Sequence, residues 1–401
     1  MKKVLSFSIF LIAGLVLSQI VPNLIEEGYD SLQDTISILL YICLSFIMIN
    51  VGREFELDKV RWRRYVSDYF IAMATAALPW LLVAFYFVVI LLPVEYNTNW
   101  EAWKESLLLS RFAAPTSAGI LFTMLAAIGL RTSWVYKKIQ VLAIFDDLDT
   151  IILMIPLQII MIGMKWQMMA VVVIVIVLLW YGWRKMGCYK IRQDWKALIF
   201  YSVVIVTLTW SLHFITSSFL GADEGIHIEV LLPAFVFGML MSAVHIDNKI
   251  ERRASGAVSM IFMLLVGMSM PTFIGDHSIT ENLAPGATLL GSQPMMPMGR
   301  IFMHVLIVSL LSNIGKLVPL LFYRDRLFEE RLALSIGMFT RGEVGAGIIF
   351  IALGYNIGGP ALIISVLSIV LNLILTGFFV ILVRRLSLKA ALKNGSSLIT
   401  E

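Results

Sequence analysis

Long runs of hydrophobic residues, separated by short polar connections, dominate the chain. A membrane-spanning helix needs about 20 consecutive apolar residues, and runs near that length recur from one end to the other. They cover residues 4–20, 36–51, 69–92, 107–130, 139–162, 168–183, 197–219, 226–244, 257–274, 301–323, 332–353 and 361–383. The pattern predicts an all-α polytopic membrane protein with about twelve transmembrane helices.

The composition supports a membrane protein with a single domain over residues 1–401. Hydrophobic residues make up 59% of the chain and charged residues 14%, against roughly 45–50% and 25% in soluble proteins. The formal charge of +4 is too small to indicate a nucleic-acid partner. With only two cysteines, Cys43 and Cys188, neither a disulfide scaffold nor a cysteine metal site is expected.

The basic residues are distributed unevenly among the polar connections. Lys and Arg gather near both ends and in every second connection, for example at Arg63, Arg131 and Lys249, whereas the other connections carry acids such as Glu95 and Asp223. Because basic connections resist translocation across a membrane, they are expected on the cytoplasmic side. The alternation predicts an even number of helices with both termini in the cytoplasm.

Three carboxylates fall inside the apolar run 139–162, namely Asp146, Asp147 and Asp149. An ionisable residue within the membrane is costly and is a functional candidate by default. Asp146 and Asp147 project about 100° apart on a helix, so different roles are expected for them. The alternative is that the helix starts near Ile151 and the aspartates are solvated, which leaves the apolar stretch 141–145 unexplained.

A lysine in the run 301–323 is the candidate partner of these carboxylates. From Lys138 to Asp147 is nine residues and from Lys316 to Arg324 is eight, so at about 1.5 Å per residue both groups lie roughly 12–14 Å from the cytoplasmic side. Lys316 is therefore level with the aspartates. The alternative is a lysine whose charged end reaches the cytoplasmic headgroups.

Two other runs are interrupted near their middle, at Pro115 in 107–130 and at Arg341-Gly342-Glu343 in 332–353. Proline removes a backbone donor, and glycines weaken a helix. Backbone groups freed at that depth must be satisfied by protein or water. The sequence predicts two broken helices, with an ordinary kink at Pro115 and a purely structural Arg341–Glu343 pair as alternatives.

The positions of the interruptions indicate an internal repeat. The third to fifth runs and the tenth to twelfth form an inverted repeat, if the first triplet starts on the cytoplasmic side of the membrane and the second on the outer side. Interrupted hydrophobic segments at corresponding places in two halves are typical of transporters, in which half-helix ends meet at the membrane midplane.

Together these residues resemble the cation:proton antiporter superfamily, within it the branch of bacterial sodium/proton and Kef-type potassium/proton antiporters. The resemblance implies that Asp147 is the ion carrier and Na⁺ ligand, and that Asp146 pairs with Lys316. Pro115-Thr116-Ser117 resembles the unwound crossing of one broken helix, and Arg341-Gly342-Glu343 resembles that of the other. Thr116 and Ser117 would supply neutral oxygens to the cation.

Some residues depart from the family pattern. Arg111 has no counterpart in the family, and Ala113-Ala114 stands where many relatives have an Asp or a longer polar run. Asp149 either supports the ion site or relays a proton, or it only lines the cavity. Glu229, near an outer helix end, either lines the entrance or faces headgroups.

The resemblance implies secondary active exchange of Na⁺ or Li⁺ for H⁺ by alternating access, electrogenic, with no cofactor and no enzyme activity. A core of residues 68–163 and 299–384 would move against a scaffold of 1–52 and 167–275. The scaffold would also form a homodimer, in the lipid of a bacterial cytoplasmic membrane.

Three alternatives stay open. A potassium/proton antiporter of this architecture would use the same residues. A sodium-coupled organic-anion symporter is a neighbouring fold class, for which paired aspartates and Lys316 are unexpected. An intramembrane aspartyl protease needs two aspartates on separate helices that share a proton, and here Asp146 and Asp147 adjoin on one helix.

Overall fold

The computed structural model describes residues 2–24, 29–54, 62–162, 166–220, 230–241, 249–269, 288–294, 296–355 and 357–393. Within these ranges the secondary structure is helical, apart from one isolated bridge between Tyr189 and Met241. The α-helices are α1 (Lys2–Leu24), α2 (Tyr29–Glu54), α3 (Trp62–Tyr86), α4 (Trp100–Ser110), α5 (Ala118–Ala127), α6 (Trp134–Ile162), α7 (Trp166–Arg184), α8 (Trp195–Leu220), α9 (Leu231–Leu240), α10 (Lys249–Met268), α11 (Met298–Gly315), α12 (Val318–Leu321), α13 (Phe328–Gly337), α14 (Glu343–Gly354) and α15 (Gly359–Lys393).

Six stretches of described helix are long and apolar enough to cross a membrane. They are Asp34–Arg53, Tyr65–Leu91, Trp100–Ala127, Trp195–Thr216, Met298–Leu321 and Gly359–Lys393. Shorter apolar helices are Leu5–Val21, Val172–Arg184 and Arg253–Met268. The predicted all-α polytopic fold is confirmed, while the count of twelve spans and the cytoplasmic position of both termini stay predictions.

Contacts divide the chain into two compact units. The first contains α1, α3, α4, α5, α6 up to Leu157, the end of α10 from Val266, and α11 to α15. The second contains α2, the end of α6 from Gln158, α7, α8, α9 and α10 up to Leu265. All of the described candidate site residues lie in the first unit.

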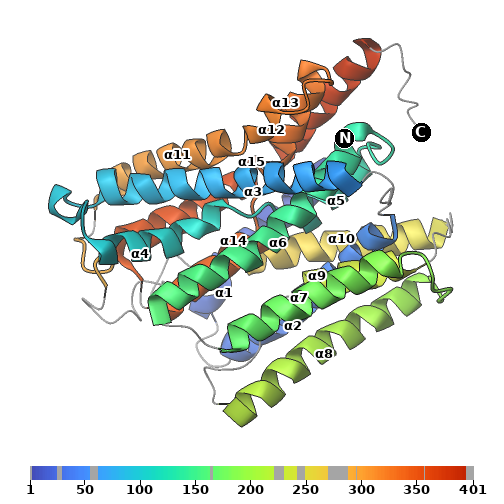
Figure 1. Ribbon diagram of the computed structural model, residues 1–401, viewed down its shortest axis with the longest axis horizontal. Helices are drawn as coiled ribbons and strands as arrows, with labels where there is room; N and C mark the ends of the chain where they lie inside the picture. Colours follow the sequence, from blue (N-terminus) through green and yellow to red (C-terminus); the bar gives the residue numbers. More distant parts are fainter. Residues whose placement is uncertain are drawn as a thin grey trace. The chain divides into compact units, whose positions relative to one another are not determined.

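Within the second unit, α2 and α9 run along each other (Figure 1). Two glycines allow their backbones to touch. A Cβ atom at Gly52 would lie 2.1 Å from the carbonyl oxygen of Phe235, and one at Gly238 would lie 2.2 Å from that of Ile49. Any larger residue at either position would force these two helices apart.

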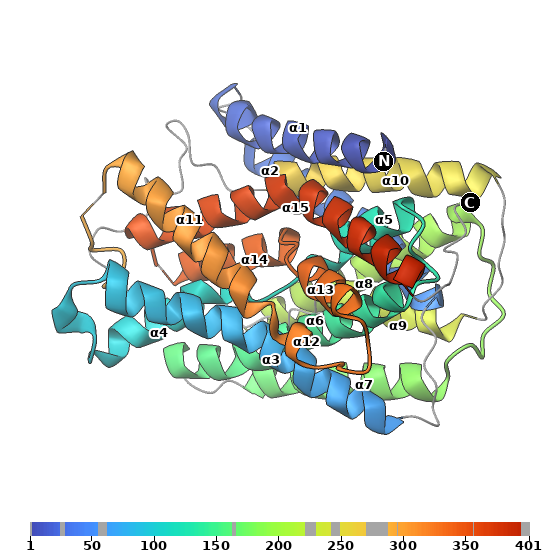
Figure 2. The ribbon, with the colours of Figure 1, turned by 90° about the horizontal axis from the view of Figure 1, so that it is seen from above.

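Within the first unit, α11 packs between α3 and α15 (Figure 2). Gly315, the last residue of α11, lies against the backbone of Pro79 on α3, where an added Cβ would be only 2.5 Å away. This close approach fixes the end of α11, and with it the residue that follows, Lys316.

Both predicted interruptions are confirmed, and a third is present that the sequence analysis did not foresee. The helix α4 ends at Ser110, a 3-10 turn η4 spans Arg111–Ala113, and α5 begins at Ala118. The helix α13 ends at Gly337 and α14 begins at Glu343. In addition, α11 stops at Gly315, so that Lys316 lies in a turn before α12 and not in mid-helix.

Candidate functional site

The two breaks of the first unit contact each other directly. The backbone N–H of Ser117, in the first break, donates to the carbonyl oxygen of Thr340, in the second, at 3.1 Å. The hydroxyl of Thr116 donates to the carbonyl oxygen of Met338 at 3.2 Å. Backbone groups that the interruptions free are thus satisfied by the opposite break, as a low-dielectric environment requires.

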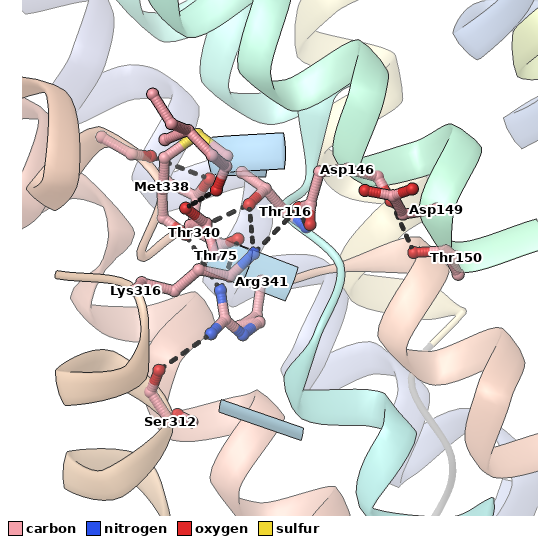
Figure 3. Close-up of polar contacts among 12 residues, drawn as sticks. Thr75, Thr116, Asp146, Asp149, Thr150, Ser312, Lys316, Met338, Thr340 and Arg341 are labelled. Carbon is pink, nitrogen blue, oxygen red and sulfur yellow. Dashed lines mark hydrogen bonds and ion pairs between the residues drawn. The ribbon is translucent and has the colours of Figure 1, made fainter. Parts of the chain in front are cut away.

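A fully buried ion pair joins this crossing to α6 and α11. Lys316 Nζ lies 2.9 Å from Asp146 Oδ2, and both side chains have 0% exposure. The same carboxylate oxygen accepts the backbone N–H of Thr116 at 2.8 Å, and Lys316 also donates to the Thr116 hydroxyl at 3.1 Å (Figure 3). This is the pair that equal depth in the membrane predicts.

Helix termini favour the placement of both charges. Lys316 caps the C-terminal end of α11, where exposed carbonyl groups favour a cation. Asp146 accepts the N–H of Thr116 just before α5 begins, and the N-terminal end of a helix favours an anion. The pair is thus held by hydrogen bonds as well as by its mutual attraction, which a buried ion pair needs to be tolerated.

Asp147 lies in the same turn of α6 and is 4% exposed. Lys316 is within electrostatic range of it. Among the described residues no group of three or more His, Cys, Asp or Glu side chains could hold a metal ion. A cation here would be neutralised by one carboxylate and would take its remaining ligands from neutral oxygens.

The second break is held by Arg341, which is 1% exposed. Its Nη1 donates to the carbonyl oxygen of Met338 at 3.0 Å, and its Nη2 to that of Ser312 at 3.5 Å. A Cβ atom at the next residue, Gly342, would lie 3.0 Å from the Ser117 hydroxyl oxygen, so glycine permits the close crossing. The backbone of Glu343 begins α14.

Two predicted residues lie partly or wholly outside the described part of the chain. The side chain of Glu343 is outside the described residues, so the alternative of an Arg341–Glu343 pair stays a prediction. Glu229 is also outside the described residues, and both of its alternative roles stay open.

Arg111 and Asp149 come together at the edge of the site. Arg111 is 0% exposed, and its Nη2 donates to the main-chain carbonyl oxygen of Asp149 at 2.9 Å. Its guanidinium lies 4.8 Å from the centre of the Trp80 ring. The side chain of Asp149 is 1% exposed. Sequence reasoning missed Trp80 and Ser312, because neither carries a charge that would mark it.

Comparison with known proteins identifies the chain. The model of the transmembrane sodium/hydrogen exchanger family matches residues 3–385. The chain belongs to this family. The exchanger is therefore an integral membrane cation/proton antiporter and not an enzyme, as the resemblance to the cation:proton antiporter superfamily implies.

Solved structures agree on the fold. A structure of the sodium/proton antiporter MjNhaP1 from Methanocaldococcus jannaschii at pH 8 has a TM-score of 0.53 at 16% identity and covers 98% of the exchanger and 91% of that chain. A second MjNhaP1 structure, from electron microscopy, has a TM-score of 0.58 at 16% identity and covers 95% and 90%. No curated protein sequence matches the exchanger.

Proposed function

We propose that the exchanger moves Na⁺ or Li⁺ against H⁺ by alternating access, with Asp147 as the carrier of both. One observation carries this proposal. The breaks of two helices meet α6 in a buried junction, where Asp146 is committed to Lys316 and Thr116. Its neighbour Asp147 lies in the same turn of α6, is 4% exposed and is within electrostatic range of Lys316.

Exchange follows from competition at one carboxylate. When the Asp147 carboxylate binds a proton it is neutral and holds no cation, and when it releases the proton to water it can bind an alkali cation. Hydroxyl oxygens of Thr116 or Ser117, carbonyl oxygens freed by the breaks and water would complete the coordination. The site then carries either a proton or a metal cation across, never both.

Asp146 and Lys316 would provide the fixed charges beside the carrier. Their buried pair keeps the local charge balanced while Asp147 changes its ligand, and loss of one partner would leave an uncompensated charge. We propose that Lys316 neutralises Asp146 when no cation is bound, and that transport is electrogenic.

The moving parts would be a core of residues 68–163 and 299–384 and a scaffold of 1–52 and 167–275, the latter forming a homodimer in a bacterial cytoplasmic membrane. The division of the chain into two contact units supports a separation of this kind. The helix α1 groups with the first unit, so its place in the scaffold is the part of this proposal that most needs a test.

Purified exchanger in proteoliposomes with an internal pH dye tests the function. Challenge with Na⁺, Li⁺ and K⁺ in turn should give proton flux with Na⁺ and Li⁺, and Asp147→Asn should abolish it while the protein stays folded. Asp194→Asn is the matched control, since that aspartate pairs with Arg192 in an exposed position. Flux driven by K⁺ alone would make K⁺ the cargo, and flux that survives in Asp147→Asn would overturn the carrier.

A further inference from the structure

The exchange chemistry leaves one buried cation beside the site without a role. Arg111 is fully buried in η4, directly before the break that carries Thr116. Burial of a guanidinium is costly unless its donors are satisfied. Yet Nε and Nη1 of Arg111 have no hydrogen-bond partner in the part of the chain that the structure describes. Packing alone therefore does not explain why this guanidinium is buried, and its contacts must be considered.

Those contacts connect three elements around the site. Arg111 Nη2 donates to the main-chain carbonyl oxygen of Asp149 on α6 at 2.9 Å. The guanidinium lies over the ring of Trp80 on α3, in the geometry of a cation–π interaction. The indole N–H of Trp80 in turn donates to the carbonyl oxygen of Leu107 on α4 at 2.7 Å. Arg111 thereby links α3, α6 and the end of α4.

The bond from Arg111 attaches the first break to α6 on one side of Pro115. Another bond runs from the backbone N–H of Thr116 to Asp146 Oδ2. Arg111 precedes Pro115 and Thr116 follows it, and on α6 the two attachment points, Asp149 and Asp146, lie on either side of Asp147. Attachments on both sides of Pro115 restrict the movement of the first break against α6 more than a single attachment, which would leave a pivot.

We propose that Arg111 is a positioning residue that sets the distance between the Asp147 carboxylate and the oxygens of the first break, and so selects among monovalent cations. This inference rests on the proposed function, because Asp147 must be the carrier. Alkali cations differ mainly in radius, so the spacing of their oxygen ligands decides which of them is preferred. A displacement of about 1 Å at a site can change a rate by about 100-fold.

Two substitutions of Arg111 test the inference in proteoliposomes. Arg111→Gln removes the charge and shortens the side chain. Arg111→Lys keeps the charge but loses the planar guanidinium and its fork of N–H donors. Apparent affinity and maximal rate should be measured separately for Li⁺, Na⁺ and K⁺. We expect the ratio of apparent affinities for the preferred cation and the next one to change by about tenfold in Arg111→Gln. A smaller change is expected in Arg111→Lys and in Trp80→Phe.

Arg331→Gln is the matched control. Arg331 also donates to a backbone carbonyl, that of Leu320 at 3.0 Å, and lies 6.0 Å from the ring centre of Phe328. It is at the start of α13, away from the crossing, and its replacement should leave the affinity ratios at the wild-type values.

A merely structural arginine would behave differently. If the Arg111 variants lower transport of all three cations in proportion, or keep wild-type ratios, the inference is overturned. If Arg111→Gln does not insert into the membrane, the ratios of apparent cation affinities in Arg111→Lys and Trp80→Phe test the inference instead. Proton flux that persists in Asp147→Asn would overturn the proposed function instead. Failure of the proposed function and failure of the Arg111 inference are therefore distinguishable.

Discussion

The break between α4 and α5 binds α6 through its polar groups, whereas the polar groups of the break between α13 and α14 bind within that break, to the first break and to α11. In the first break, Thr116 donates to Asp146, and Arg111 donates to the carbonyl oxygen of Asp149. In the second, Arg341 donates to Met338 within the same break and more weakly to Ser312.

The difference separates two tasks. Residues of the first break bind the helix that carries the aspartates, so changes there should alter ion binding. In the second break, the carbonyl oxygens of Met338 and Thr340 accept from Arg341 and from residues of the first break, so changes there should act on transport through contacts with the first.

The largest effect is expected at Lys316, which bonds both α6 and the first break. Lys316→Ala should leave Asp146 as a buried unpaired charge, and breaking such a pair typically costs about 3–5 kcal/mol of unfolding free energy. The double change Asp146→Asn with Lys316→Gln removes both charges and should recover much of that loss. Thermal unfolding in detergent should give a coupling energy above about 1 kcal/mol in a double-mutant cycle. Additive effects would contradict the pair.

Thr116 is one of the residues through which the two breaks touch. Thr116→Val removes the hydroxyl that accepts from Lys316 and donates to the Met338 carbonyl oxygen. Unsatisfied buried groups cost about 1–3 kcal/mol, so the free energy of unfolding should fall by that amount. Thr116→Ser keeps the hydroxyl and is the control. A loss in Thr116→Ser with none in Thr116→Val would show that the methyl group, and not the hydroxyl, matters.

A smaller effect is expected from the second break at Gly342. A methyl group there would lie 2.8 Å from the end of the Ile120 side chain and 3.0 Å from the Ser117 hydroxyl oxygen. Because both neighbours are side-chain ends, Gly342→Ala should cost only about 1 kcal/mol of unfolding free energy. Displacement of the Ser117 hydroxyl should nevertheless lower apparent cation affinity several-fold.

Gly347, on the helix α14 that begins directly after Gly342, provides the control for that change. An added Cβ at Gly347 has nothing within 4 Å, and alanine is about 0.5–1 kcal/mol better than glycine inside a helix. Gly347→Ala should therefore be neutral or slightly stabilising with unchanged affinity. A loss of cation affinity in Gly347→Ala equal to that in Gly342→Ala would remove the argument from contact with Ser117.

The smallest effect is expected far from the crossing, where α13 begins. The hydrogen bond from Lys393 lowers the pKa of Glu329 from 4.5 to about 2, with Lys389 contributing at 3.5 Å. A depressed pKa in the folded protein contributes stability that is present above the ordinary value and is lost as the pH falls toward about 2. Both lysine side chains are more than half exposed, so solvent weakens the effect.

Melting temperatures as a function of pH measure this contribution. Glu329→Gln should melt slightly below the wild type near neutral pH, and the difference should shrink as the pH falls through the window between about 4.5 and 2. A constant difference across this window would show that the charge of Glu329 does not contribute.

The sequence was sufficient to predict the broken helices, because proline and clustered glycines disfavour a continuous helix in any membrane protein. It also predicts that Lys316 and Asp146 lie at equal depth, since position along a helix converts directly into depth. Both inferences depend on local rules that hold whatever the neighbouring helices are.

Other features depend on tertiary contacts and could not be predicted. The stop of α11 before Lys316 lies where Gly315 approaches Pro79, two residues far apart in the sequence. Arg111 donates to the main-chain carbonyl oxygen of residue 149, a group that every residue type carries, so the sequence does not indicate this bond. Trp80 has the same identity as nine other tryptophans of the chain, and only its partners distinguish it.

Proton release from purified exchanger on addition of Na⁺ measures the competition of cation and proton for Asp147. In weakly buffered detergent solution, wild-type protein should release protons as Na⁺ binds, because cation and proton compete for Asp147. The double variant Asp146→Asn with Lys316→Gln should still release protons, since it retains the carrier. Asp147→Asn should release none. Na⁺-dependent proton release of wild-type size from Asp147→Asn would contradict the account.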